Sequence, residues 1–178
     1  YFKPNHKVIL MKFVVIFFCI WLFGIKLASA EKLSLVELSN YFNRFDTFQA
    51  DFQQFSDDGS LASGVILIKK PGRLRIDYER PEDLLILASG GQLAIFDPKG
   101  DPEPTSFPLN VTPFSIVLKS QINLVGSSNI LSHDYNHGET SLSLFDPKYP
   151  ERGHIKLIFS GETPILDRWI IQDESGNT

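Results

Sequence analysis

The chain has 178 residues, and its charges are distributed unevenly. Residues 1–30 contain four Lys and no Asp or Glu, so residues 31–178 hold 13 of the 17 basic residues and all 21 acidic ones. That part therefore has a formal charge of 13 minus 21, or -8, which argues against nucleic acid as the partner. It suits a single domain, which at this size buries about 70% of its unfolded surface without help from disulfides or metals.

Residues 1–30 have the pattern of upstream residues followed by a secretory signal. Met11 and Lys12 supply a start and a positive charge, residues 13–25 form an apolar run, and Ala28-Ser29-Ala30 is a small-x-small cleavage site. The alternative is a retained anchor helix, which would need about 20 apolar residues. We therefore predict export and cleavage after Ala30, with residues 31–178 as the mature domain.

Two short amphipathic helices are predicted. Ser34 and Glu37 have the spacing of a capping box, and an apolar stripe then recurs at helical spacing up to Phe45. A second helix is predicted where Thr112 would cap a first-turn Pro113.

Most of the remaining sequence predicts β-strands. From Thr47 the residues Phe48, Ala50 and Phe52 alternate with polar ones, as in a half-buried strand. Further strands are predicted at residues 64–68, 74–78, 84–88, 92–96, 140–145, 154–159 and 166–171. The proline-rich residues 97–108 predict a loop. Ser175-Gly176 has the character of a hairpin turn, so we expect the domain to continue beyond the last residue given.

No catalytic constellation stands out. His133 and His137 have the spacing of a helical metal pair, but Asn136 and Gly138 between and after them favour a solvated loop. The only Cys, Cys19, would leave with the signal, which excludes a disulfide scaffold, a thiol enzyme and a cysteine zinc site from the mature chain. We therefore predict a protein that is not an enzyme and has no metal or cofactor.

The apolar residues allow two interpretations. A sheet curled round short helices can enclose an apolar pocket for lipids. An ordinary hydrophobic core explains the same patterning, and patterning alone favours it, because most apolar stripes are simply core.

A series of short motifs resembles one family. In order they are Phe48-x-Ala50-x-Phe52-x-Gln54, Lys70-Pro71, Pro81, the turn at Gly90, Leu93-x-x-Phe96-Asp97-Pro98 and Thr112-Pro113-Phe114. Following a signal peptide, this series resembles the LolA family of periplasmic carriers of outer-membrane lipoproteins. The resemblance implies a mainly β fold, a half-open antiparallel β-barrel with short helices forming a lid over an apolar cavity.

The resemblance also implies site residues. The lipid-binding positions of the family fall on Phe48, Phe52, Leu74, Ile76, Ile86, Phe114 and Val117. Where the family has an Arg that holds the lid shut through lid backbone carbonyls, this chain has Lys70, which donates hydrogen bonds but lacks the planar fork. Arg73 could share that role as a lid latch.

The implied function is a monomeric periplasmic carrier that shuttles acylated lipoproteins from the inner to the outer membrane. Its implied partners are the lipoproteins, an inner-membrane ABC transporter that loads the carrier and an outer-membrane receptor that unloads it. The alternative is a lipid-sensing periplasmic regulatory domain on the same half-barrel, which would carry a further C-terminal domain.

Overall fold

The computed structural model describes residues 31–56 and 58–172, which form a mainly antiparallel β structure with few helices. The helices are α2 (Leu35–Asn43) and α3 (Phe114–Val117), with 3-10 turns η1 (Leu109–Val111) and η2 (Pro150–Arg152). The strands are β1 (Thr47–Phe55), β2 (Leu61–Lys69), β3 (Arg73–Tyr78), β4 (Leu85–Ser89), β5 (Gln92–Phe96), β6 (Thr105–Pro108), β7 (Ile130–Asn136), β8 (Glu139–Phe145), β9 (His154–Ser160) and β10 (Ile165–Gln172).

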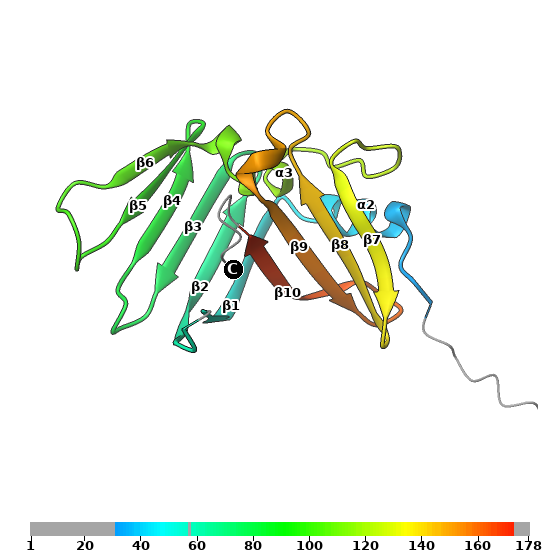
Figure 1. Cartoon of the computed structure of the whole chain (residues 1–178), viewed down its shortest axis with the longest axis horizontal. Coiled ribbons are helices and arrows are strands. Elements are labelled where there is room, and N and C mark those ends of the chain that lie inside the picture. Colours follow the sequence, from blue (N-terminus) through cyan, green and yellow to red (C-terminus); the bar gives the residue numbers. More distant parts are fainter. Residues whose placement is uncertain (1–30, 57, 173–178) are drawn as a thin grey trace, which may run out of the picture.

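The strands form two sheets that are not closed into a barrel. The first sheet has the order β1-β2-β3-β4-β5-β6, and the second has the order β10-β9-β8-β7. Because neighbours in each sheet are consecutive in the chain, both sheets are simple meanders. Figure 1 shows the two sheets inclined to each other, with β1 and β10 near their junction and the helices toward the upper end of the view.

Helix α2 begins as predicted. The Ser34 Oγ accepts a hydrogen bond from the Glu37 N–H, and the Glu37 carboxylate accepts one from the Ser34 N–H, which completes the capping box. The hydrogen bond from the Ser34 side chain, followed by that from its backbone, lowers the pKa of Glu37. The helix ends at Asn43, so Phe45 lies beyond it and is 52% exposed.

Three local predictions were wrong. The expected loop at residues 97–108 contains strand β6, which pairs with β5 despite its prolines, as an edge strand can. His133 lies in strand β7 and not in a loop, while His137 occupies the β7–β8 turn with a positive φ. Thr112 does not cap α3, because its hydroxyl donates to the Leu109 carbonyl and Pro113 is the N-cap.

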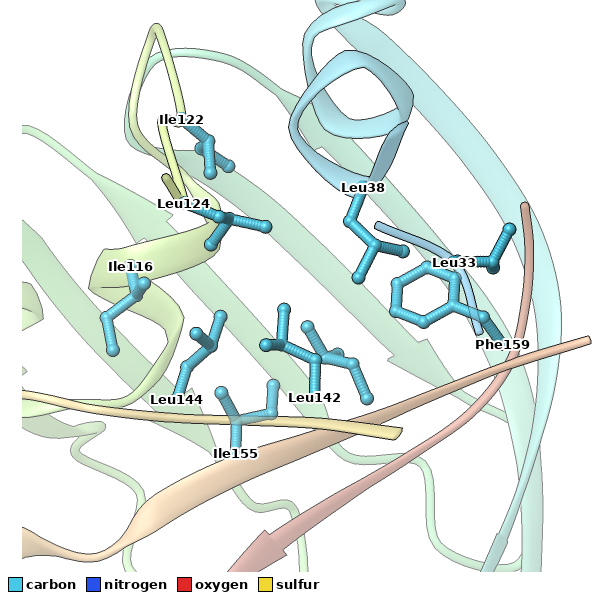
Figure 2. Close-up of a cluster of buried hydrophobic side chains, with 10 residues drawn as sticks. Leu33, Leu38, Ile116, Ile122, Leu124, Leu142, Leu144, Ile155 and Phe159 are labelled. Carbon is cyan, nitrogen blue, oxygen red and sulfur yellow. The ribbon is translucent and has the colours of Figure 1, made fainter. Parts of the chain in front are cut away.

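The described residues form two hydrophobic clusters, one for each sheet. The second sheet packs against α2, against Ile116 of α3 and against residues that follow α3, as Figure 2 shows. In this cluster Leu38 of α2 and Phe159 of β9 are fully buried, and the rings of Tyr41, Phe42 and Phe159 meet edge to face. Helix α2 is therefore anchored on the second sheet.

Candidate functional site

The candidate site is the inner face of the first sheet, which we call the inner apolar surface. Its buried members on the strands are Ile66, Leu74, Ile76, Ala88 and Leu93, and Leu109 of η1 and Leu118 after α3 belong to the same buried cluster. The antiparallel register aligns Ile66, Ile76, Ile86 and Ile95 in one row across β2 to β5. Because side chains alternate between the two faces of a strand, the residues next to these positions, such as Arg75 and Asp77 beside Ile76, point to the opposite face.

All seven residues predicted to bind lipid lie on this surface. Leu74 and Ile76 are buried within it. Half-buried side chains from three other elements pack against them: Phe48 and Phe52 of β1, Ile86 of β4, and Phe114 and Val117 of α3. The structure thus brings together residues that are up to 69 positions apart in the chain, from 48 to 117.

One end of the inner apolar surface is built around Gly64. This residue pairs with Phe52 on one side and Tyr78 on the other, and the two rings meet edge to face with centroids 5.1 Å apart. A Cβ at position 64 would lie 2.8 Å from the Phe52 ring, so the glycine leaves the space that the ring occupies. The Tyr78 hydroxyl donates to the Gln54 side chain, and burial raises the pKa of Tyr78.

Helix α3 packs against the inner apolar surface and connects it with the second sheet. Its Phe114 ring meets Trp169 of β10 edge to face, with centroids 6.5 Å apart. Val117 and Trp169 pack against both hydrophobic clusters. The inner apolar surface is thus covered by the protein's own side chains. These side chains pack through apolar contacts, so a ligand that displaced them would not need to replace hydrogen bonds.

Lys70 lies at the turn between β2 and β3, beside the end of α2. Its Nζ donates a 2.5 Å hydrogen bond to the carbonyl oxygen of Phe42, in the last turn of the helix. Its backbone N–H donates to the Asp46 carbonyl at 2.7 Å. Burial lowers the pKa of Lys70, and the nearby Asp46 carboxylate opposes this shift. A cation at the C-terminal end of a helix also interacts favourably with the helix dipole.

Arg73, the second predicted latch residue, does not share this position. It is exposed on the opposite face of the first sheet, opposite Lys69 in the register. Its side chain makes no hydrogen bond or ion pair with the residues that the structure describes. Of the two predicted latch residues, Lys70 is therefore the one that donates a hydrogen bond to α2.

Sequence reasoning missed Trp169, which links the two sheets. The alternation of Leu166, Trp169 and Ile171 is interrupted by a bulge next to residue 167, which hides the shared face of these residues. It also missed Ile66, Ala88, Leu93, Leu109 and Leu118, although the first three follow the alternation of their strands.

The described residues offer little for other site types. In residues 31–56 and 58–172, no three His, Cys, Asp or Glu side chains converge as metal ligands. The same residues contain no helix that is both long and apolar enough to span a membrane. The His133 ring, considered above as a metal ligand, instead meets the Leu33 carbonyl through Nε2 at 2.9 Å.

Comparison with known proteins gives one consistent result. The family model described as outer membrane lipoprotein carrier protein LolA matches residues 43–178. The chain belongs to the LolA family. The matched range includes Lys70 and all seven residues of the predicted lipid site, whereas most of α2 precedes it.

Curated relatives carry the same description. An outer-membrane lipoprotein carrier protein of Coxiella burnetii is 28% identical over 107 residues, which cover 55% of this chain and 51% of the relative. One from Nitrosomonas europaea is 29% identical over 159 residues, covering 82% of this chain and 72% of the relative. One from Histophilus somni is 36% identical over 67 residues, covering 35% and 33%. The LolA-family chain thus spans about half the length of the Coxiella relative that it matches.

Proposed function

We propose that this LolA-family chain is a periplasmic carrier that binds the acyl chains of lipoproteins and shuttles them from the inner to the outer membrane. The observation that carries the proposal is the convergence of seven predicted lipid-binding side chains in one apolar cluster, five from the first sheet and two from α3. In this proposal the two sheets act as a half-open barrel, and α2 and α3 form the lid over the site. The family's description favours a carrier over the lipid-sensing regulatory domain.

The transfer energy of an acyl chain explains why a carrier is needed. Each CH₂ group taken out of water contributes about 0.8 kcal/mol, so a long acyl chain contributes on the order of ten kcal/mol. A chain of this kind is not released into water on a useful timescale. It must pass by direct contact from one apolar surface to another, and no covalent chemistry is required of the carrier.

The contacts of α3 suggest how the site could accept such a chain. Phe114, Val117 and Trp169 fill the inner apolar surface through non-directional apolar packing. An acyl chain could replace these contacts without leaving a buried polar group unpaired, which is the expensive outcome in a protein interior. Phe48, Phe52, Leu74, Ile76 and Ile86 would then form the floor of the site.

Lys70 is proposed as the latch of the closed form. Its hydrogen bond to the Phe42 carbonyl joins the first sheet to α2, and the helix dipole favours the same contact. Together these effects are worth roughly 0.3–2 kcal/mol, enough to bias a lid yet small enough for a bound acyl chain to reverse. Arg73, which is exposed, is no longer needed for this role.

The proposed partners follow from the direction of transport. Loading against the affinity of lipoproteins for the inner membrane requires an energy source, which we assign to an ABC transporter in that membrane. Unloading requires a receptor on the outer membrane with an apolar site of its own. We further propose that the carrier acts as a monomer, exported through a signal peptide that is cleaved after Ala30.

Complementation tests this function directly. The full-length gene should restore growth to a Gram-negative strain depleted of its own lipoprotein carrier, and periplasmic lipoproteins should recover their outer-membrane location. A matched gene with Phe52→Glu should fail, while Gln53→Glu, which places the same charge on the exposed opposite face of β1, should succeed. Failure of the wild-type gene, expressed and exported at normal levels, would reject the carrier function.

A further inference from the structure

The path of the chain divides the described part into two halves. Residues 47–118 contain the whole first sheet, η1 and α3, and residues 31–43 and 122–172 contain α2 and the whole second sheet. The chain passes between the halves twice, through residues 44–46 and residues 119–121. All six residues are exposed and lie outside helices and strands. Short loop connections of this kind are where protein hinges occur.

The hydrogen bonds around the two connections support this division. On the side of the second sheet, the Asn43 side chain donates to the Ile122 carbonyl at 2.8 Å and accepts from the Ile122 N–H at 2.9 Å. Asn43 is the residue before the first connection, and Ile122 is the residue after the second. One side-chain amide thus ties the two connections together where they leave the second half.

The first half ties the same connections together at their other ends. Lys70 donates its backbone N–H to the carbonyl of Asp46, the last residue of the first connection. Gly72 donates its N–H at 2.9 Å to the carbonyl of Leu118, which directly precedes the second connection. The β2–β3 turn therefore holds both ends on the side of the first sheet, just as Asn43 does on the other side.

Helix α2 belongs firmly to the second half. The Ser39 hydroxyl, one helical turn before Asn43, accepts a buried hydrogen bond from the Leu124 N–H at 3.0 Å. The Tyr41 hydroxyl lies 3.4 Å from the Leu166 N–H, and Leu38 is completely buried. In contrast, among the described residues the hydrogen bond that links α2 to the first half is the one from the Lys70 side chain to the Phe42 carbonyl.

We propose that the protein opens as two rigid halves about residues 44–46 and 119–121, with Ser39 and Asn43 keeping α2 on the second sheet while the two sheets move apart. The inference rests on the proposed lipid site, because separation of the halves uncovers the inner apolar surface. It changes the nature of the lid, since α2 opens together with the second sheet and does not swing away from both sheets. Lys70 is then a latch between the two halves.

Three distances separate this opening from the swing of a helix alone. Spin labels are placed on exposed residues Val36 of α2, Gln53 of β1 and Asp134 of β7, two at a time, in the exported protein, which has lost Cys19 with its signal peptide. Double electron–electron resonance then gives the distances 36–134 within the second half, and 36–53 and 53–134 between the halves. Each pair is measured in the wild type and in Lys70→Leu, without any ligand.

For Lys70→Leu we expect both distances between the halves to shift or broaden together, while 36–134 keeps the wild-type distribution. A change in 36–134 with 53–134 constant would mean that α2 swings alone, and would overturn the proposal. Unchanged distances in all three pairs would overturn it as well.

The role of Asn43 is tested by Asn43→Leu, which removes both bonds to Ile122 at similar side-chain volume. We expect 36–134 to broaden in this variant, and to stay unchanged in the control Asn40→Leu on the exposed side of the same helix. Equal distributions in the two variants would contradict the positioning role of Asn43.

A fluorescent palmitoyl-peptide probe provides a separate arm. Its addition to the wild type should shift the same two distances. If the probe does not bind, the proposed lipid site fails, while the distances in Lys70→Leu still decide whether the protein opens as two halves.

Discussion

The ammonium group of Lys70 donates a hydrogen bond to the backbone carbonyl of Phe42, across the junction between the first sheet and helix α2. Lys70→Leu removes this bond and keeps only an apolar side chain, which is too short to reach the carbonyl and cannot donate to it. We expect the variant to fold and to accept lipoprotein, but to pass it on about two- to thirtyfold more slowly, the range that corresponds to 0.3–2 kcal/mol. The reason is that the hydrogen bond stabilises the closed, empty form. Without it, closure of the lid no longer favours release of the lipoprotein.

A two-step assay measures this effect: loading from inner-membrane vesicles, then transfer to the purified outer-membrane receptor. Lys70→Arg should retain transfer, since its guanidinium can donate to the same carbonyl. Arg73→Leu is the matched control and should behave as the wild type, because Arg73 is exposed and does not contact α2. Normal transfer by Lys70→Leu would show that Lys70 is a surface charge without a role as a latch.

Phe52→Glu should abolish binding of a fatty-acyl probe. The ring of Phe52 packs on the inner apolar surface, where an ionised carboxylate without a partner costs several kcal/mol. Probe fluorescence measures binding, and circular dichroism shows whether the variant remains folded. Gln53→Glu adds the same group on the exposed face and should bind normally. Equal binding by both variants would show that the probe does not use this surface.

Gly64→Ala should destabilise the protein by about 1–3 kcal/mol, as overpacking of a well-filled interior does. The added Cβ would lie 2.1 Å from the Asp77 carbonyl oxygen and 2.8 Å from the Phe52 ring. Urea unfolding gives the free energy. Gly100→Ala is the control, because its Cβ would chiefly meet the flexible Asp97 side chain, and it should be nearly neutral. A stable Gly64→Ala variant would contradict the close packing of β1, β2 and β3.

The stability of the protein should depend on pH through His133. Burial lowers the pKa of His133, with Lys32 acting in the same direction, against the opposing effects of the Leu33 carbonyl and Asp134. The unfolded chain then binds a proton more readily than the folded one, so this contribution is complete above the unfolded pKa of about 6.5 and is lost as the pH falls below it.

Thermal unfolding between about pH 7.5 and pH 5.5 measures this dependence. The midpoint of the wild type should fall with pH, and His133→Gln should flatten the slope. His137→Gln, in the exposed β7–β8 turn, should leave the slope as in the wild type. An unchanged slope in His133→Gln would assign the pH dependence to other groups.

Processing provides an independent prediction. Expressed in a bacterium with an export system, the chain should be cleaved after Ala30, since small residues at positions 28 and 30 fit the peptidase. N-terminal sequencing of the periplasmic product checks the site. A product that still begins at Met11 and stays with the membrane would contradict it.

Local patterns predicted most of the elements. The capping box of Ser34 and Glu37 marked the start of α2, and alternation marked the strands from Phe48 to Phe96. Strand β7 was missed for two reasons. Its sequence is rich in polar residues, and a bulge at residue 131 breaks the alternation that signals a strand. Strand β6 was missed because prolines normally exclude a strand, except at the edge of a sheet.

The candidate site was only partly predictable. Alternation placed Leu74 and Ile76 on one face of the strand. The packing of α3 and Trp169 against that face could not be predicted, because it depends on contacts between segments far apart in the sequence. The contact of Lys70 with Phe42 was expected only through the family resemblance. Asn43 carries no sequence signal, because its partner is the backbone of a residue 79 positions away.

Release of lipoprotein from a membrane tests the central claim most directly. Inner-membrane vesicles that contain the ABC transporter and an acylated lipoprotein are incubated with the purified protein and ATP, and the soluble fraction is analysed. We predict a soluble complex of the protein with the lipoprotein, which depends on ATP and on the acyl chains and is absent with Phe52→Glu. If the folded wild-type protein leaves all lipoprotein in the vesicles, the inner apolar surface is an ordinary core and the proposed carrier function is wrong.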